Sequence, residues 1–407
     1  MSQNPTLDIA KLVPLMAASS GLAVANIYFN QPLLETIAHS LGIGLAAVAP
    51  VAMATQLGYA AGLLFLGPLG DRLPRKGIIV ALGVGLTGAM LGASLASTAG
   101  ALIGASLAVG LFATLAQQIV PMAAHLAPPE QRGRIVGNVM SGLLFGILGG
   151  RFVAGFLGSV VGWRGVFAFG AGLAAGLTAV LAWRLPRVPP ATGESLGRLL
   201  LSVFGLARRY RVLRAASLTG ALLFAAFSVF WVALTPLLAT SFHLGSQAAG
   251  LFGLIGATGA LVAPWAGRMS DRIGPNRVLL MGIAVILAAF LVFAVSGRSL
   301  AGLAVGSILL DGGTQAALIA NQSRIFAVAR RASSRVNAFF MTCYFLGGSA
   351  GSLAAGQAWA RAGWGGAVGT GLLFVCAAGF ADLLIEHSAR RRRKRRARTR
   401  PADQGER

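Results

Sequence analysis

Apolar positions in this chain form long uninterrupted runs that are separated by short polar turns. An apolar run of about 20 residues is long enough to cross a bilayer as a helix. The strands of a membrane β-barrel would instead alternate between apolar and polar positions over about 10 residues. We therefore expect an all-α membrane protein with twelve transmembrane helices, at roughly 12–34, 46–66, 78–97, 100–122, 135–158, 164–184, 214–239, 248–267, 277–296, 300–322, 337–359 and 365–386.

The second half of the chain repeats features of the first. Two turns share the order glycine, aspartate, arginine at a separation of about 200 residues: Gly67, Asp71 and Arg72, then Gly267, Asp271 and Arg272. Pro32-Leu-Leu, near the end of the first apolar run, also recurs at Pro236. Because the repeat needs the first run, we do not interpret that run as a cleaved signal peptide. The repeat predicts two pseudo-symmetric six-helix bundles at 1–184 and 214–386, a basic linker at 185–213 and a basic tail at 387–407.

Composition supports a membrane protein, since 56% of the residues are hydrophobic and 11% are charged. A soluble chain carries about 25% charged residues. The formal net charge of +23 could suit a nucleic-acid partner, but most basic residues lie in alternate turns, in the linker and in the tail. Cytoplasmic loops carry this excess of Lys and Arg. We expect a multi-pass protein of the bacterial inner (plasma) membrane, with both termini cytoplasmic, basic segments against the anionic inner leaflet and no bound nucleic acid.

Polar side chains interrupt several of the apolar runs. Five of them lie close together in the first run: Asn26, Tyr28, Asn30, Gln31 and Glu35. A polar group in hydrocarbon needs a partner or water. These residues therefore either line an aqueous cavity or hydrogen-bond to neighbouring helices. Gln56, Gln117 and Gln315, in the second, fourth and tenth runs, are placed on the same substrate and proton pathway.

Arg151 is a charged residue inside the fifth apolar run. It lies about 16 residues, or roughly 24 Å, from the inner end of the expected helix, which puts it in the outer half of the membrane. Glu35 is the acid nearest to it in depth, and a long arginine side chain can reach toward the interface. We expect Arg151 to pair with Glu35 or to bind an anionic group of a substrate.

Asp311 lies near the middle of the tenth run, roughly 17 Å from its outer end. An ionisable residue at this depth is a functional candidate, although a structural hydrogen bond to a neighbouring helix is the alternative. No Lys or Arg in the other runs is evident at the same level. Burial favours the neutral form of a carboxyl, so Asp311 is the candidate for proton coupling, ahead of Glu35.

The charged turn carries a resemblance to a known family. Gly67-Pro-Leu-Gly-Asp71-Arg72-Leu-Pro-Arg75-Lys76 resembles the cytoplasmic loop signature of the major facilitator superfamily, with Pro74 in place of the usual glycine. The resemblance implies the major facilitator fold and a substrate site near the midplane, between the bundles. It also implies a gating role for Asp71. The gating loop then comprises Gly67, Asp71, Arg72, Arg75 and Lys76, with Asp271 and Arg272 as the second copy.

Other segments resemble the sugar- and drug-efflux branch of this superfamily. They are residues 26–34, the run Asp311 to Arg324, and the glycine-rich fifth run Gly142-x-x-x-Gly146-x-x-Gly149-Gly150. Leu148 departs from the efflux pattern because it occupies a position where that branch usually has proline. Glycines four apart on one helix face also let another helix approach closely.

The resemblance implies a secondary active transporter that exports a small organic solute, such as a drug, a sugar or an amino acid-like compound, in exchange for protons. The sequence has no ATP-binding loop of the Gly-x-x-x-x-Gly-Lys-Ser/Thr type, so a gradient would supply the energy. Alternatives are a facilitator or proton symporter that imports its solute, a non-transporting receptor, and a membrane enzyme. The four histidines lie outside the apolar runs, which argues against an enzyme. We expect a monomer that interacts with a small-molecule substrate, protons and lipid, without a cofactor or metal.

Overall fold

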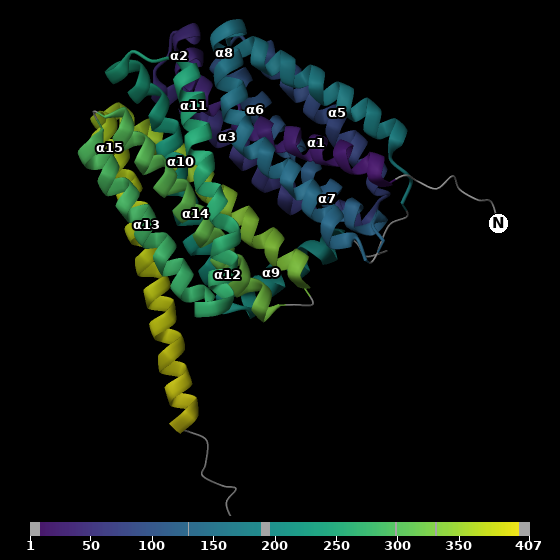
Figure 1. The fold of residues 1–407 in the computed structure, drawn as a ribbon, viewed down its shortest axis with the longest axis vertical. Helices are drawn as coiled ribbons and strands as arrows, with labels where there is room; N and C mark the ends of the chain where they lie inside the picture. Colours follow the sequence, from purple (N-terminus) through teal and green to yellow (C-terminus); the bar gives the residue numbers. More distant parts are fainter. Residues whose placement is uncertain (1–8, 129, 189–195, 298, 330–331, 399–407) are drawn as a thin grey trace, which may run out of the picture.

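The computed structural model describes residues 9–128, 130–188, 196–297, 299–329 and 332–398. Throughout these ranges the ordered elements are helices (Figure 1), so the prediction of an all-α protein is confirmed. Helices from the first half of the chain lie on one side of the molecule and helices from the second half on the other (Figure 1). Residues 387–398 of the predicted basic tail continue helix α15, whereas residues 399–407 and the side chains from 385 onward lie outside the described part.

The first half begins with a helix that breaks before its expected end. Its elements are α1 (Ile9–Tyr28), η1 (Gln31–Leu33), α2 (Leu34–Leu41), α3 (Leu45–Phe65), α4 (Leu69–Arg72), α5 (Arg75–Ser94), α6 (Ala99–Ala113), α7 (Leu115–Leu126) and α8 (Arg132–Arg184).

A short helix over the predicted linker, α9 (Leu196–Arg209), leads into the second half. The remaining elements are α10 (Arg211–Phe242), α11 (Ser246–Ala257), η2 (Thr258–Val262), α12 (Ala263–Ile273), α13 (Pro275–Ser296), α14 (Leu300–Val328) and α15 (Ser333–Arg398).

In the described residues, nine helices are long and apolar enough to cross a membrane. Two of them, α8 and α15, each consist of two helices that meet at a kink. The kinks fall at Gly162 (φ 71°) and Gly363 (φ 54°), which occupy equivalent positions in the repeat, and positive φ favours glycine. Counting α8 and α15 as two helices each, and α11, η2 and α12 together as the eighth predicted crossing, this arrangement is compatible with the twelve predicted crossings.

Two of the expected continuous helices are broken. The first apolar run leaves the α conformation after Tyr28 and passes through the 3₁₀ turn η1, which contains Pro32. The equivalent proline, Pro236, lies inside the unbroken helix α10. The eighth run is divided into α11, η2 and α12. At each break, the backbone and side chains within the membrane point in directions that a regular helix would not allow.

Glycines bring helices within each half into close contact. A β-carbon at Gly146 on α8 would lie 2.0 Å from the carbonyl oxygen of Gly21 on α1. In the second half, one at Gly347 on α15 would lie 2.0 Å from the carbonyl oxygen of Ala221 on α10. Only residues without a side chain allow backbones this close. The predicted close approach of a helix to the glycine-rich fifth run is therefore present in both repeats.

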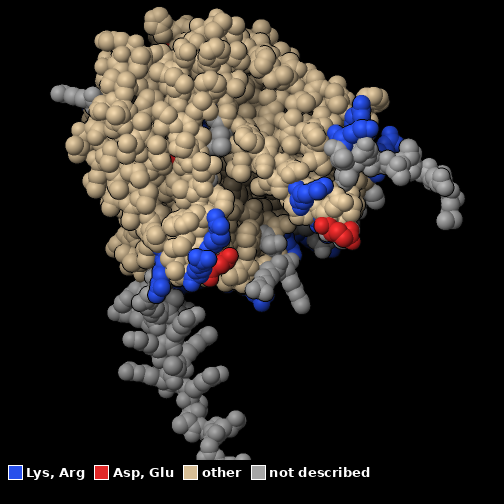
Figure 2. Space-filling model, viewed as in Figure 1, with Lys and Arg blue, Asp and Glu red and all other residues tan. Residues whose placement is uncertain are grey.

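The two halves pack against each other through a second pair of equivalent contacts. Gly155 on α8 lies against Gly250 on α11, and Gly356 on α15 lies against Ala49 on α3. Ser246 Oγ donates a hydrogen bond to the carbonyl oxygen of Gly155 at 3.1 Å. These contacts lie near the turns that carry few basic residues. We call the opposite end, where the Lys and Arg side chains gather, the basic end (Figure 2).

The surface is hollowed between the two halves toward the basic end (Figure 2). The helices thus meet closely at one end of the molecule and separate toward the other.

Candidate functional site

Arg151 is the central residue of a polar cluster where the two halves meet. Its side chain projects from α8 and is 2% exposed. Arg151 Nε donates a hydrogen bond to Gln31 Oε1 at 2.7 Å. Gln31 belongs to η1, so the break after α1 places a side-chain acceptor next to the buried guanidinium. The backbone of the same residue accepts a hydrogen bond from Thr235 Oγ1 of α10 at 2.9 Å, which ties η1 to the second half.

Aromatic rings enclose the guanidinium group of Arg151. Its Cζ atom lies 4.3 Å from the ring centroid of Tyr28 on α1 and 4.3 Å from that of Trp231 on α10. Phe227, one turn earlier on α10, lies at 5.5 Å. The negative faces of aromatic rings attract a cation, most strongly where water is excluded. The rings therefore stabilise a charge that would otherwise be costly to bury.

Asp311 on α14 belongs to the same cluster and is 9% exposed. A β-carbon at Gly256 of α11 would lie 2.8 Å from Asp311 Oδ2 and 3.0 Å from Trp231 Cζ2. Asp311 also interacts electrostatically with Arg151. The expectation that no basic residue lies at its level was wrong, because depth along a single helix does not account for the tilt and breaks of the others.

Three polar atoms of this cluster are buried and have no hydrogen-bond partner among the described residues. They are Arg151 Nη2, Trp231 Nε1 and Asp311 Oδ2; the last two face each other and interact without full hydrogen-bond geometry. Buried polar groups in folded proteins are nearly always paired, so an unpaired group of this kind calls for an explanation. Beside them lies a crevice too tight to hold a water molecule in this structure, lined by Gln31, Pro32, Arg151, Trp231, Leu234, Thr235 and Ala249.

Glu35 is not the partner of Arg151. It lies half-buried in the first turn of α2, and within the described ranges no ion pair joins it to Arg151. Gln31 takes the predicted place of Glu35, because the turn at η1 directs the intervening residues away from a straight helical path. The alternative expectation, that Arg151 binds an anionic group of a substrate, stays a prediction.

The other polar residues of the first run do not share one face. Asn30 Nδ2 donates to Thr55 Oγ1 on α3 at 2.7 Å, which is the interhelical bond that the sequence left as the alternative. Asn26 lies against the position of Gly170 on α8, and both of its amide atoms are buried without a partner in the described part of the chain. Only Tyr28 and Gln31 reach Arg151.

Gln56 forms a polar bridge between the halves. Its Nε2 donates to Ser352 Oγ on α15 at 3.1 Å, and its Oε1 accepts from Ser228 Oγ on α10 at 3.4 Å. Ser352 is the repeat equivalent of Arg151, so the same position carries a charge in one half and a hydroxyl in the other.

Two further glutamines that the sequence placed on the pathway lie apart from Arg151. Gln117 Nε2 donates to the Tyr59 hydroxyl at 3.1 Å. The ring of Tyr59 contacts that of Phe345 across the halves, with centroids 4.5 Å apart. Gln315 is half-buried on α14.

The gating loop lies at the basic end, around α4. Arg72 is exposed, and Arg75 and Lys76 are half-buried at the start of α5. The side chain of Asp71 lies outside the described part. Gly67, just after α3, is held from α7, because Gln118 Nε2 donates to the carbonyl oxygens of Leu66 and Gly67 at 3.0 and 3.1 Å. In the second copy, Asp271 and Arg272 are exposed in the last turns of α12.

Several residues of the site are absent from the sequence-based prediction. Trp231 gave no signal, since a tryptophan in an apolar run is ordinary. Gly253 and Gly256 could have been found, because glycine recurs every third residue from 250 to 259. Gly253 accommodates the stem of Arg151, whose Cβ would lie 2.7 Å from a β-carbon there. Groups of three or more His, Cys, Asp or Glu that could hold a metal ion do not occur in the described residues.

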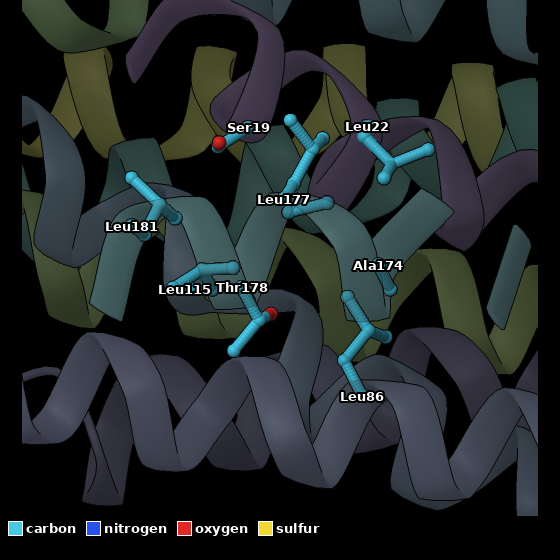
Figure 3. Close-up of a pocket in the computed structure, with 9 residues that line it drawn as sticks. Ser19, Leu22, Leu86, Leu115, Ala174, Leu177, Thr178 and Leu181 are labelled. Atoms are coloured by element: carbon cyan, nitrogen blue, oxygen red, sulfur yellow. The ribbon is translucent and has the colours of Figure 1, made fainter. Parts of the chain in front are cut away.

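A second cavity lies within the first half and has a different character (Figure 3). Its lining comes from α1, α5, α7 and α8 and comprises Ser19, Leu22, Ala23, Leu86, Leu115, Ala174, Leu177, Thr178 and Leu181. Two hydroxyls are the only polar side-chain groups among these lining residues. This cavity has room for about one water-sized group and offers no charge for recognition or proton transfer, so the Arg151 cluster remains the candidate site.

Comparisons with known proteins agree on one family. The model of the Major Facilitator Superfamily matches residues 16–352 and 216–404. The uncharacterized transporter YgaY of Escherichia coli O157:H7 is 41% identical, covering 92% of this chain and 93% of that protein. The probable transporter SCO4007 of Streptomyces coelicolor is 35% identical, covering 95% of this chain and 89% of that protein.

A solved structure supports the fold independently. A bacterial homologue of the human lysosomal transporter Spinster, in an inward-facing and unoccupied conformation, superposes with a TM-score of 0.76. The match covers 94% of this chain and 98% of that chain, at 15% sequence identity. The predicted major facilitator fold is thereby confirmed, while the count of twelve transmembrane helices stays a prediction.

Proposed function

Because this chain belongs to the major facilitator superfamily, we propose that it is a secondary active transporter that couples a small organic solute to protons through the Arg151 cluster. The observation that carries this proposal is the burial of Arg151 and Asp311 together, between the two halves. Ionisable residues at such depth mark solute or proton pathways. In this family of folds the site between the halves is exposed alternately to either side.

We place the basic end on the cytoplasmic side of a bacterial inner membrane, with both termini cytoplasmic. The support is the excess of Lys and Arg at that end, which is typical of cytoplasmic loops. In this orientation the close contacts at Gly155 and Gly356 seal the outer side, and the hollow opens inward (Figure 2). The structure then corresponds to an inward-facing state. Asp71 is proposed to stabilise the opposite state by its position near a helix N-terminus.

Asp311 is the proposed proton-binding group. Coupling requires a group that is charged in one state and neutral in the other. Asp311 is nearly buried, faces Trp231, and interacts with Arg151 across the boundary of the two halves. When the halves move, the distance from Asp311 to this charge and to water changes, and so does the free-energy difference between its two protonation states.

The Arg151 cluster could couple the solute to protons in two ways, by exchange or by movement in the same direction. Different observations support each of them. Export in exchange for protons rests on the resemblance of residues 26–34, of the fifth run and of residues 311–324 to the efflux branch. Movement of the solute together with a proton rests on the opposite charges of Arg151 and Asp311, since protonating Asp311 would leave Arg151 available to a solute.

The test begins with a flux screen of candidate solutes in a pump-deficient host, with Asp311→Asn as the control. A solute that passes is then measured in proteoliposomes with a pH gradient of either sign. Accumulation toward the acidic side indicates exchange, and accumulation toward the alkaline side indicates joint movement. Binding without any flux would make the protein a receptor and would contradict the proposal.

A further inference from the structure

We infer that the Arg151 cluster binds an organic anion, a solute that carries a carboxylate or similar oxyanion on a flat apolar body. This inference deepens the proposed function and rests on its placement of the site between the two halves. It concerns the charge and shape of the solute, which the family does not define.

Unpaired donors call for an acceptor at this site. The Nε atom of Arg151 already donates to Gln31, but its Nη2 atom has no acceptor among the described residues. The Nε1–H donor of Trp231 is also buried; it faces the carboxyl of Asp311 without reaching full hydrogen-bond geometry, so it is available to another acceptor when Asp311 is protonated, and its ring lies 4.3 Å from the guanidinium carbon. Leaving buried donors unsatisfied is unfavourable. A carboxylate could accept from both of them, and such charge-assisted bonds are the strong ones.

The surroundings also select the shape and charge of the solute. The rings of Tyr28 and Trp231 flank the guanidinium, and Pro32, Leu234 and Ala249 line the crevice beside it. The crevice has no room for a solute in this structure, so binding requires the surrounding helices to move apart. A cationic solute would meet the guanidinium of Arg151 on the same ring faces and would be repelled. A neutral solute could accept a hydrogen bond from the guanidinium but would not neutralise its charge, so it should bind more weakly than an anion. A flat anion suits both the rings and the charge.

The carboxylate of Asp311 competes with the solute anion for the positive charge of Arg151. The charged and titratable groups that interact with it, among the described residues, are Arg151 from α8, Tyr28 from α1 and Tyr344 from α15. When Asp311 is ionised, it neutralises Arg151. When it is protonated, the positive charge is available to the solute. Anion binding and proton binding therefore strengthen each other, as linkage requires, and this favours joint movement over exchange.

The test is a binding measurement on the purified full-length protein in detergent, where no gradient is present. Thermal stabilisation reports binding to the folded state. The probes are three carboxylates, benzoate, phenylacetate and 2-naphthoate, each with its neutral amide, at pH 6 and pH 8. All three acids stay ionised at both values, since a carboxyl titrates near pH 4. We expect at least one carboxylate to bind about tenfold tighter than its amide, and tighter at pH 6 than at pH 8.

Variants locate the effect. Arg151→Gln should weaken carboxylate binding by about tenfold to a hundredfold, as expected for a lost charge-assisted bond. Trp231→Phe keeps an aromatic ring but removes the Nε1–H donor, and it should weaken carboxylate binding severalfold. This variant also tests the site if Arg151→Gln does not fold. At pH 8, Asp311→Asn should bind the carboxylate with the affinity that the unmodified protein shows at pH 6. The matched control is Arg164→Gln, because Arg164 also lies over a tryptophan, 4.2 Å from the ring of Trp163, but outside the site.

Three results would overturn the inference: equal binding of carboxylate and amide, carboxylate binding that survives both Arg151→Gln and Trp231→Phe, or no stabilisation by any carboxylate in the unmodified protein and in Asp311→Asn. The proposed function fails separately. The proposed function is contradicted if proteoliposomes show no pH-driven flux. The anion site is contradicted by the equilibrium binding measurement in detergent, which needs no membrane.

Discussion

Two buried arginines in this protein are neutralised in different ways. Arg324 on α14 forms an ion pair with Asp382 on α15, with Nη1 and Oδ1 2.8 Å apart and side-chain exposures of 10% and 2%. It also donates to Asn321 Oδ1 at 3.3 Å. Arg151 has no acid within ion-pair distance in the described ranges and is surrounded by aromatic rings instead. A fully paired charge is a structural element, whereas an incompletely paired one is available to a ligand.

Asp382→Asn should therefore destabilise the protein. Removing one partner of a buried pair leaves the other charge uncompensated, which costs about 3–5 kcal/mol. Thermal inactivation in detergent measures the effect, with Asp271→Asn as the control because Asp271 is exposed on α12. Equal inactivation temperatures for the two variants would show that the Arg324 pair contributes little.

Single charges in apolar runs were visible in the sequence, but their partners were not. Asp311 and Arg151 are conspicuous because ionisable residues are rare in hydrocarbon. Their proximity depends on α11, whose glycines let α8 and α14 approach, and on the turn at η1. Gln31 was predicted as one of five polar residues, yet only the break at Tyr28 explains why it, and not Glu35, reaches Arg151.

At the scale of elements, α11 acts as a thin spacer between the two charged helices. Gly253 faces Arg151 of α8, and Gly256 faces Asp311 of α14. The apolar character of this run was predicted, but its division into α11, η2 and α12 was not, although Pro264 in the first turn of α12 was a visible signal for a break. The equivalent prolines also differ in their effect. Pro32 lies in the break at η1, whereas Pro236 lies inside the continuous helix α10.

Gly256→Ala should impair transport in a protein that still folds. The added methyl would approach Asp311 Oδ2 to 2.8 Å and the Trp231 ring to 3.0 Å, and such overpacking costs about 1–3 kcal/mol. Initial rates in proteoliposomes test this, with Gly88→Ala as the control because a β-carbon at Gly88 on α5 has nothing within 4 Å. Matching rates for the two variants would argue against α11 as a spacer.

At the scale of the whole molecule, the repeat explains why the two halves close at one end. Gly155 with Gly250 and Gly356 with Ala49 are equivalent pairs, one on each side of the pseudo-symmetry axis. Gln56 adds a polar bridge between them. The sequence revealed the repeat, but the end at which the halves close depends on contacts between distant helices.

A cross-link at this seal should stop transport. Ala49→Cys combined with Gly356→Cys, in a chain with Cys343 and Cys376 replaced by serine, should form a disulfide once the two helices separate slightly, because the β-carbons would lie 2.5 Å apart here and a disulfide needs about 3.8 Å. Oxidation should then abolish flux, and reduction should restore it. Full transport by the cross-linked protein would show that this contact does not open during the cycle.

The gating loop offers a comparison between the two halves. Asp71→Asn should severely reduce transport while the protein still inserts, because the carboxylate near a helix N-terminus would be lost. Asp271→Asn should be tolerated, since Pro275 and Asn276 replace part of the basic cluster in the second copy. Flux and membrane abundance are measured for both variants. If both tolerate the change equally, the gate lies elsewhere.

The most direct test of the whole account is pH-gradient-driven flux in proteoliposomes that contain either the unmodified protein or Asp311→Asn. We expect the unmodified protein to concentrate its solute on one side of the membrane. Asp311→Asn should lose this accumulation but keep part of the downhill exchange, since the solute site at Arg151 remains. If Asp311→Asn still concentrates the solute against its gradient, the coupling carboxyl is another residue, and the central claim is contradicted.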